Sequence, residues 1–199
     1  MSTKQHEKDI ERFDQWSDRY ENSWLQRVIF DPTHQETLAL AAEIIPQPAD
    51  VLDVGCGTGK LLRRVHARWP QTHLIGVDPA EGMIEIAKRQ TPYATFYTGM
   101  AETLPLQDAS VDLALSTISF HHWQDQAAGV RAIARVLRPG GYFILVDMSF
   151  PGWLLQVFRQ RRVHDRPQMR ALFNQAGLQV QTQQSLTWRR VLATVGKKP

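Results

Sequence analysis

The sequence has almost no cysteine and no long apolar run, and each of these absences excludes a class of protein. Cys56 is the only cysteine among 199 residues, so neither an intrachain disulfide nor a cluster of thiolate metal ligands is possible. No apolar run is long enough to span a membrane. The segment 1–14 is dense in charge and lacks the apolar stretch of a secretory signal. Together these absences predict a cytoplasmic protein.

Internal repeats and low-complexity linkers are also absent, and the length fits one domain on a prior of about 100–200 residues per domain. Hydrophobic residues make up 43% of the chain and charged residues 22%, which provides enough apolar material for a substantial core. The net charge of +3 permits an anionic partner without requiring one. Much of the basic excess falls within 159–170, where such a run is usually the solvated face of a helix.

What the sequence does contain is a regular alternation of apolar strands and amphipathic helices. We expect strands at 49–54, 73–77, 94–98, 111–117 and 142–147, and helices at 33–45, 58–69, 80–89 and 125–137. This alternation predicts an α/β fold with a doubly wound, mostly parallel sheet. Two more strands, at 178–186 and 189–195, follow one another directly. They predict an antiparallel pair at one edge, which completes a seven-stranded sheet.

The turn between the first strand and the following helix is rich in glycine. Gly55, Gly57 and Gly59 alternate after Asp53, and without Cβ atoms they let a ligand lie against bare backbone and allow positive φ. The spacing fits neither common phosphate-binding motif. The dinucleotide fingerprint requires a third glycine where Lys60 stands, and the P-loop requires a further glycine and a hydroxyl that are missing. A glycine-rich turn that serves only strand–helix packing is the plain alternative.

The pattern that remains, acid-x-G-x-G-x-G after a strand, resembles motif I of the class I S-adenosylmethionine-dependent methyltransferases. The segments 99–105, 110–113 and 135–141 extend the likeness to the small-molecule methyltransferases that include the quinone-biosynthesis C-methyltransferases. The resemblance covers about residues 50–147. It implies a Rossmann-like fold with S-adenosylmethionine as cofactor, a ligand that has no phosphate and needs no phosphate-binding lysine.

The resemblance also divides the chain by role and names the residues expected to hold the cofactor. It implies a single methyltransferase domain over 1–199, with an N-terminal helical lid over 1–48, a cofactor-binding core over 49–147, a helical substrate insertion over 152–176 and a C-terminal strand pair over 178–196. The implied cofactor contacts are Tyr20, Asp53, Gly55, Cys56, Gly57, Gly59, Asp78, Pro79, Met100, Ala101, Glu102, Ser116 and Thr117.

Asp78 ends the second predicted strand, where a carboxylate can accept hydrogen bonds from both ribose hydroxyls. The run Asp78–Glu81 also has the form of a helix N-cap followed by proline and glutamate, and the two roles are compatible. The adenine is implied to lie near Met100 and Ala101. Met100 departs from the family, which commonly has an acid there. Either Glu102 substitutes, or apolar contact holds the adenine.

Two adjacent histidines, His121 and His122, follow the fourth strand. His121 is the candidate catalytic residue, as a general base, because imidazole titrates near neutral pH; alternatively it packs beside the cofactor. A metal site is not expected, because neighbouring side chains diverge and no other ligand cluster is visible. Ser116–Ser119 stands where families that methylate base amino groups have an Asn- or Asp-Pro-Pro-aromatic tetrad, and Cys56 lies in the glycine turn. Nucleic acid is therefore not expected as a substrate.

The flanking segments offer shape without a diagnostic motif. Tyr20 is expected to lie over the methionine end of the cofactor, or alternatively to belong to an aromatic packing stripe within 13–20. The segment 153–162 is apolar and then basic, which suits either a pocket cover or weak contact with a membrane surface.

The sequence thus predicts methyl transfer from S-adenosylmethionine to a small-molecule or lipid-like acceptor by in-line displacement. The alternative is a non-catalytic protein that binds S-adenosylmethionine or S-adenosylhomocysteine for regulation or scaffolding. No motif specifies the acceptor, the atom that is methylated or the oligomeric state.

Overall fold

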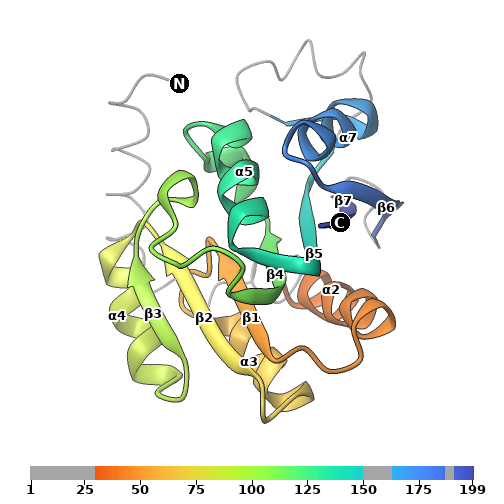
Figure 1. The fold of residues 1–199 in the computed structure, drawn as a ribbon. Coiled ribbons are helices and arrows are strands. Elements are labelled where there is room, and N and C mark those ends of the chain that lie inside the picture. Colours follow the sequence, from red (N-terminus) through yellow and green to blue (C-terminus); the bar gives the residue numbers. More distant parts are fainter. Residues whose placement is uncertain (1–29, 150–162, 187–190) are drawn as a thin grey trace.

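The computed structural model describes residues 30–149, 163–186 and 191–199. Its centre is a seven-stranded sheet in the order β3-β2-β1-β4-β5-β7-β6 (Figure 1). The strands are β1 (Asp50–Val54), β2 (His73–Asp78), β3 (Thr95–Thr98), β4 (Val111–Thr117), β5 (Leu137–Met148), β6 (Gln179–Ser185) and β7 (Val191–Lys197). The helices are α2 (Asp31–Ile44), α3 (Lys60–Arg68), α4 (Glu81–Gln90), α5 (Gln126–Val136) and α7 (Arg166–Gln175), with short 3-10 helices η2 (Ala101–Thr103) and η3 (Phe120–His122).

The strand pairing confirms the predicted α/β fold with its doubly wound sheet. Strands β1 to β5 pair in parallel, whereas β7 is antiparallel to both β5 and β6. From β1 the chain builds outward to β3 on one side, and then returns to place β4 on the other side. Ligands in such sheets bind where the strand order reverses, outside the carboxyl ends of the strands. The fold therefore points to the carboxyl ends of β1 and β4 as the place for a site.

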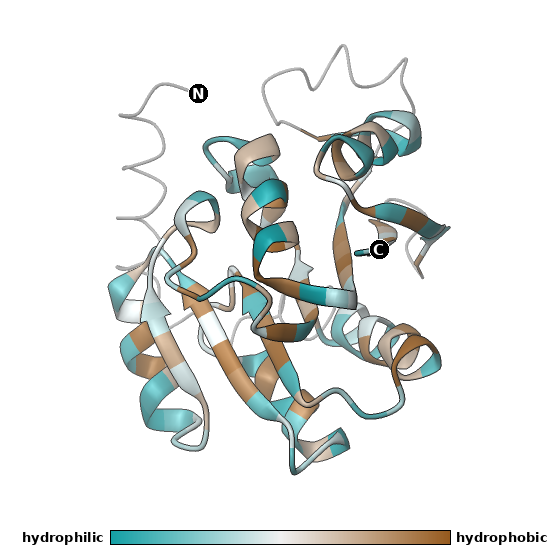
Figure 2. Ribbon diagram, viewed as in Figure 1, coloured by the Kyte–Doolittle hydropathy of each residue, from teal (hydrophilic) through white to brown (hydrophobic). Residues whose placement is uncertain are grey.

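Apolar side chains fill both faces of the sheet. One buried cluster joins the strands to α2, α3 and α4, and the other joins them to α5 and α7. The central strands are accordingly apolar along most of their length (Figure 2). Burial on both faces is what makes strands of parallel sheets read as continuous apolar runs, and it fixes the strand ends that carry the site.

The predicted boundaries between α5 and β5 are wrong. The helix expected to reach residue 137 ends at Val136, and the strand expected from 142 begins already at Leu137. Leu137 pairs with Val111 and Tyr142 with Leu113, so the residues between them bulge out of register. Gly140 has a φ of 82°, and glycine tolerates that conformation within a strand.

The helix before β1 also starts earlier than expected, at Asp31 rather than at 33.

No helix within the described ranges is long and apolar enough to cross a membrane. The same part of the chain holds no group of three or more His, Cys, Asp or Glu side chains that could bind a metal ion. Tyr20 and the segment 153–162 lie outside the described residues, and the division of the chain by role stays a prediction.

Candidate functional site

The loop between β1 and α3 has the backbone that its glycine spacing predicts. Gly55, Gly57 and Gly59 have φ values of 76°, 51° and 78°, a region that residues with a Cβ atom seldom adopt. A Cβ on Gly55 would lie 2.4 Å from the Cβ of Ser119, whereas one on Gly57 would meet nothing within 4 Å. Gly55 therefore permits close packing, and Gly57 leaves its backbone accessible in a cavity wall.

Ser119 ties the segment after β4 to this glycine turn. Its hydroxyl donates to the carbonyl of Val54 at 3.1 Å and shares a hydrogen bond of 2.8 Å with the hydroxyl of Ser116. Ser116 is fully buried. In the structure its hydroxyl is therefore bound to Ser119.

Asp78 joins the glycine turn to the start of α4. One carboxylate oxygen accepts the N–H of Gly57 and the other accepts the N–H of Ala80, each at 2.9 Å. The helix N-cap is Ala80 rather than Asp78, so the N-cap alternative for Asp78 is wrong by two positions. The carboxylate is buried at the end of β2.

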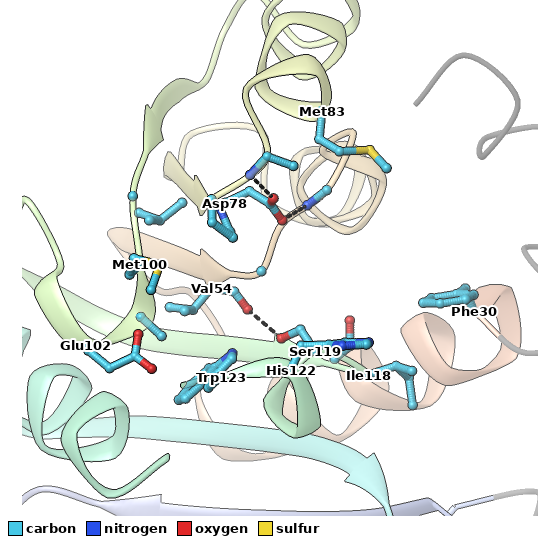
Figure 3. Close-up of a pocket in the computed structure, with 18 residues that line it drawn as sticks. Phe30, Val54, Asp78, Met83, Met100, Glu102, Ile118, Ser119, His122 and Trp123 are labelled. Atoms are coloured by element: carbon cyan, nitrogen blue, oxygen red, sulfur yellow. Dashed lines mark hydrogen bonds between the residues drawn. The ribbon is translucent and has the colours of Figure 1, made fainter. Parts of the chain in front are cut away.

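A cavity lies at the carboxyl ends of β1, β2 and β4 (Figure 3). Its wall combines bare backbone at glycine positions with apolar and aromatic side chains. The lining residues are Phe30, Val54, Gly55, Gly57, Val77, Asp78, Pro79, Ala80, Met83, Gly99, Met100, Ala101, Glu102, Thr117, Ile118, Ser119, His122 and Trp123. This is the place that the strand order indicates for a ligand.

A second, smaller cavity adjoins the first and shares Phe30, Gly55, Gly57 and Thr117 with it. Its wall comes from α2, from the glycine turn and from the first turn of α3. The remaining lining residues are His34, Asp53, Cys56, Thr58, Lys60 and Leu61.

Most of the predicted cofactor residues line one of these two cavities: Asp53, Gly55, Cys56, Gly57, Asp78, Pro79, Met100, Ala101, Glu102 and Thr117. Within the described ranges, Gly59 and Ser116 are in neither wall. A Cβ on Gly59 would lie 3.1 Å from the ring of Phe96, so this glycine serves the packing of α3 on the sheet. That any of these residues, Gly59 and Ser116 included, binds a cofactor stays a prediction.

Burial changes the chemistry of Asp53. The side chain is 2% exposed, and burial together with the nearby charge of Asp78 raises its pKa to about 8. Removal from water disfavours the charged form of a carboxyl group. Asp53 therefore holds a proton at neutral pH while the protein has no ligand beside it.

The donor set fits a sulfonium nucleoside better than a dinucleotide. The Asp78 carboxylate beside the glycine turn suits ribose hydroxyls and repels a pyrophosphate, and the carboxyl group of Asp53 adds an acceptor for an ammonium group. Lys60 at the start of α3 is bound to Asp31, with 2.8 Å between the ammonium nitrogen and a carboxylate oxygen. The cation that a phosphate would use is thus engaged elsewhere.

Met100, Ala101 and Glu102, the residues expected near the adenine, are all on the wall of the larger cavity. Met100 is one of the labelled residues on the wall of the cavity in Figure 3. One carboxylate oxygen of Glu102 accepts the N–H of Asp125 at 2.8 Å. That bond ties the cavity wall to the start of α5, so Glu102 has a structural task in addition to the proposed contact with adenine.

His121 has a carboxylate partner that the sequence did not indicate. Its Nδ1 lies 2.8 Å from a carboxylate oxygen of Asp147, and its backbone N–H donates to the other oxygen at 3.0 Å. Asp147 is at the end of β5 and is 2% exposed. An imidazole that donates from Nδ1 keeps a lone pair on Nε2. Among the described residues it is the adjacent His122, rather than His121, that lines the cavity.

Sequence reasoning missed the contribution of α2. Phe30 and His34 line the smaller cavity, and Thr33, His34 and Thr37 are buried on one side of the helix. Polar residues at helical spacing within a buried stripe were the available signal. The spacing gives the face, but it does not show that this face meets the glycine turn.

Comparisons with known proteins agree with this geometry. Residues 52–145 match the family model described as "Methyltransferase domain". An uncharacterized methyltransferase of Mycobacterium tuberculosis is 42% identical over 96 residues, which are 48% of this chain and 38% of the relative. Demethylmenaquinone methyltransferase of Deinococcus radiodurans is 33% identical over 141 residues, which are 67% of this chain and 58% of the relative. The chain thus spans less than two thirds of the length of these relatives.

Among solved structures, a SAM-dependent methyltransferase from Aquifex aeolicus superposes with a TM-score of 0.75 at 16% identity. The superposition covers 94% of this chain and 98% of that one. At this identity the likeness concerns the fold alone.

Proposed function

Because residues 52–145 match the methyltransferase domain family model and the fold is like that of a SAM-dependent methyltransferase, we propose that the protein transfers a methyl group from S-adenosylmethionine to a small-molecule or lipid-like acceptor. The observation that carries the proposal is the position of Asp78. Its buried carboxylate stands at the cavity wall, held by the N–H groups of Gly57 and Ala80. Such a fixed carboxylate at the end of β2 suits the two hydroxyls of a ribose.

The proposed cofactor site runs across the carboxyl edge of the sheet. Asp53, Gly55 and Gly57 would hold the methionine end, Asp78 the ribose, and Met100 with Ala101 the adenine. S-adenosylmethionine, when bound, supplies an electrophilic methyl group attached to a sulfonium. The glycine turn contributes bare backbone at Gly57, so that a ligand can approach the main chain closely.

In this proposal the residues around the reacting centre form no covalent bond with the cofactor or the acceptor. Alignment of two reactants at near-attack distance supplies about 7–11 kcal/mol, and the cavity wall provides the alignment. Phe30, Ile118 and Trp123 make part of that wall apolar, which excludes water from the reactants. Apolar side chains beside the sulfonium would also avoid stabilising the ground state more than the transition state.

We assign His121 the role of general base, with Asp147 as its positioning residue. The bond from Nδ1 to Asp147 would keep Nε2 able to accept a proton from the acceptor. The proposal is supported by the position of the pair, with His121 in η3 after β4 and Asp147 near the end of β5, next to the cavity residue His122.

The nature of the acceptor is inferred from the wall and from one relative. Phe30, Met83, Ile118 and Trp123 offer apolar contacts next to the cofactor region, which suits an apolar ring or chain. The relative from Deinococcus radiodurans is named for demethylmenaquinone, a name that fits the same class. A contact between the segment 153–162 and a membrane surface stays a prediction.

Calorimetric titration with S-adenosylmethionine tests the proposal. Asp78→Asn should bind the cofactor about 10- to 100-fold more weakly, because hydrogen bonds to a charged group contribute about 1.5–3 kcal/mol. Asp108→Asn is the matched control, since Asp108 is 75% exposed and pairs with Arg135 away from the cavity. Equal affinity in Asp78→Asn and the wild type would remove the ribose assignment.

A labelled-methyl assay separates catalysis from binding alone. The protein is incubated with S-adenosylmethionine labelled in its methyl group and with a metabolite extract. Transfer of label to an extract component is the expected result. Cofactor binding without transfer from any extract would favour a regulatory or scaffolding protein instead.

A further inference from the structure

Ile118, on the wall of the larger cavity, has a backbone conformation that its own side chain makes costly. Its φ is 51°, in the left-handed region, where a β-branched residue is a genuine outlier because its Cβ crowds the following carbonyl oxygen. Glycine adopts this conformation without that cost. Among the residues with a Cβ atom in the described part of the chain, only Ala109 also has a positive φ. The use of isoleucine at this position therefore requires an explanation.

Hydrogen bonds on both sides of Ile118 impose this conformation. Its N–H donates to the carbonyl of Val146 on β5 at 2.8 Å. The next residue, Ser119, donates from its hydroxyl to the carbonyl of Val54 at 3.1 Å, and its carbonyl accepts the N–H of His122 at 2.9 Å. The chain therefore has to turn at residue 118 as it leaves β4. Strained conformations persist where the surroundings impose them, so these bonds explain the turn, but they do not explain the side chain.

The side chain of Ile118 has two kinds of surroundings. It is half-buried and packs partly on the apolar cluster that joins the sheet to α2, α3 and α4. It also forms part of the cavity wall. Strained residues collect at ligand sites, where the strain is part of how the site is arranged. The position of the exposed part of Ile118 on a cavity wall thus favours contact with a ligand over packing alone.

Figure 3 separates Ile118 from the residues expected near the adenine. In this view Met100 and Trp123 lie toward one end of the cavity. Phe30 and Ile118 lie toward the other end, with His122 between the two. In the proposed function the adenine is beside Met100, so the end with Ile118 is available to the acceptor.

We propose that Ile118 is a specificity-determining residue for the acceptor, and that its strained conformation is retained because its side chain contacts the apolar part of that molecule. This inference rests on the proposed function, which supplies the acceptor. Ile118 forms no bond and moves no proton. Because a β-branched side chain is stiff, it presents a fixed apolar surface. Acceptors whose ring or chain fits that surface are then favoured over those that leave it unfilled.

The variant Ile118→Gly separates this role from a role in the turn alone, because glycine keeps the turn and removes the side chain. Transfer of label from S-adenosylmethionine to the extract component that the wild type methylates should fall about tenfold or more, since each lost methylene contact costs about fourfold. The affinity for S-adenosylhomocysteine should stay within about twofold of the wild type. The melting temperature should stay within about 4 °C, because relief of strain offsets the lost packing.

Ile118→Val provides a graded second variant, because valine keeps the branching and the strain but lacks one methylene. It should reduce label transfer to the same component about two- to fourfold. Ala109→Gly is the matched control. Ala109 has a similar φ of 50° at an exposed position outside both cavity walls. Its replacement by glycine should not lower the melting temperature and should leave label transfer unchanged.

Failure of the inference and failure of the proposed function give different results. If the wild type transfers label and Ile118→Gly labels the same component at the same rate, the acceptor contact is refuted while the proposed function stands. A loss of label transfer matched by an equal loss of S-adenosylhomocysteine affinity also refutes it, because Ile118 would then serve the cofactor. If Ile118→Gly does not fold, unchanged transfer in Ile118→Val refutes the contact and reduced transfer supports it. If the wild type transfers no label from any extract, the proposed function itself fails.

Discussion

Asp53 shows how strongly the glycine turn changes the chemistry of one side chain. The carboxyl group is fully enclosed, and burial and then the charge of Asp78 raise its pKa to about 8. The sequence alone places Asp53 next to the glycines. It does not show that the second carboxylate, which comes from the neighbouring strand β2, lies close enough to affect the titration of the first.

The stability of the free protein should depend on pH through Asp53. Its pKa is near 3.8 in an ordinary environment and about 8 in the fold, so between these values the unfolded chain has lost a proton that the folded chain retains. The free energy of unfolding of the wild type should then fall relative to Asp53→Asn as pH rises from about 4 to about 8. Urea denaturation of both proteins at several pH values measures the difference. A difference that does not vary with pH would contradict the assignment.

The His121–Asp147 pair makes a separate prediction at the residue scale. His121→Gln should lower the rate of label transfer about 100-fold and leave the affinity for S-adenosylhomocysteine unchanged, because the imidazole acts on the acceptor. Asp147→Asn should lower the rate less, since it disturbs only the orientation of the ring. His73→Gln, at an exposed position, should not alter the rate. Weaker cofactor binding in His121→Gln, with an unchanged rate at saturation, would assign His121 to binding instead.

At the scale of elements, the site depends on how the β1–α3 loop packs against the segment after β4. Ser119 binds the carbonyl of Val54 and occupies the space where a Cβ on Gly55 would lie. Asp78 fixes the other side of the loop through Gly57. The loop is thus held from β2 and from the β4 side, which leaves a rigid cradle at the ends of the strands.

Alanine substitutions at two glycines of this loop should have different costs. Gly57→Ala has space for its Cβ and should lose about 1–2 kcal/mol of stability from positive φ alone. Gly55→Ala adds an overlap with Ser119, so we expect about 2–5 kcal/mol in total. Chemical denaturation measures both, and Gly55→Ala combined with Ser119→Gly should recover part of the loss. Equal costs for the two single variants would contradict the packing role of Gly55.

The elements that the sequence predicts well are those fixed by local chemistry. The positive φ values of Gly55, Gly57 and Gly59 follow from their spacing, and the alternation of apolar runs gives the strands. Contacts between distant segments are not encoded in this way. The partnership of His121 with Asp147 arises from the pairing of β4 with β5, and the position of His34 arises from the packing of α2 near the glycine turn. The early start of β5 depends likewise on pairing with Val111.

For the whole molecule, the strand order matters more than any one motif. Reversal of the order between β1 and β4 brings Asp53, Asp78 and the residues after β3 and β4 to one edge of the sheet. The same architecture accepts dinucleotides in other proteins. The choice of ligand here therefore rests on side chains: two carboxyl groups beside the turn, and a lysine already bound to Asp31.

The most direct test of this account is a crystal structure of the complex with S-adenosylhomocysteine. We predict that both ribose hydroxyls lie within hydrogen-bonding distance of the Asp78 carboxylate, and that the amino-acid end reaches the cavity shared by Asp53 and Gly57. A ribose bound away from Asp78, or a cleft beside Gly57 closed by side chains in the complex, would contradict the central claim.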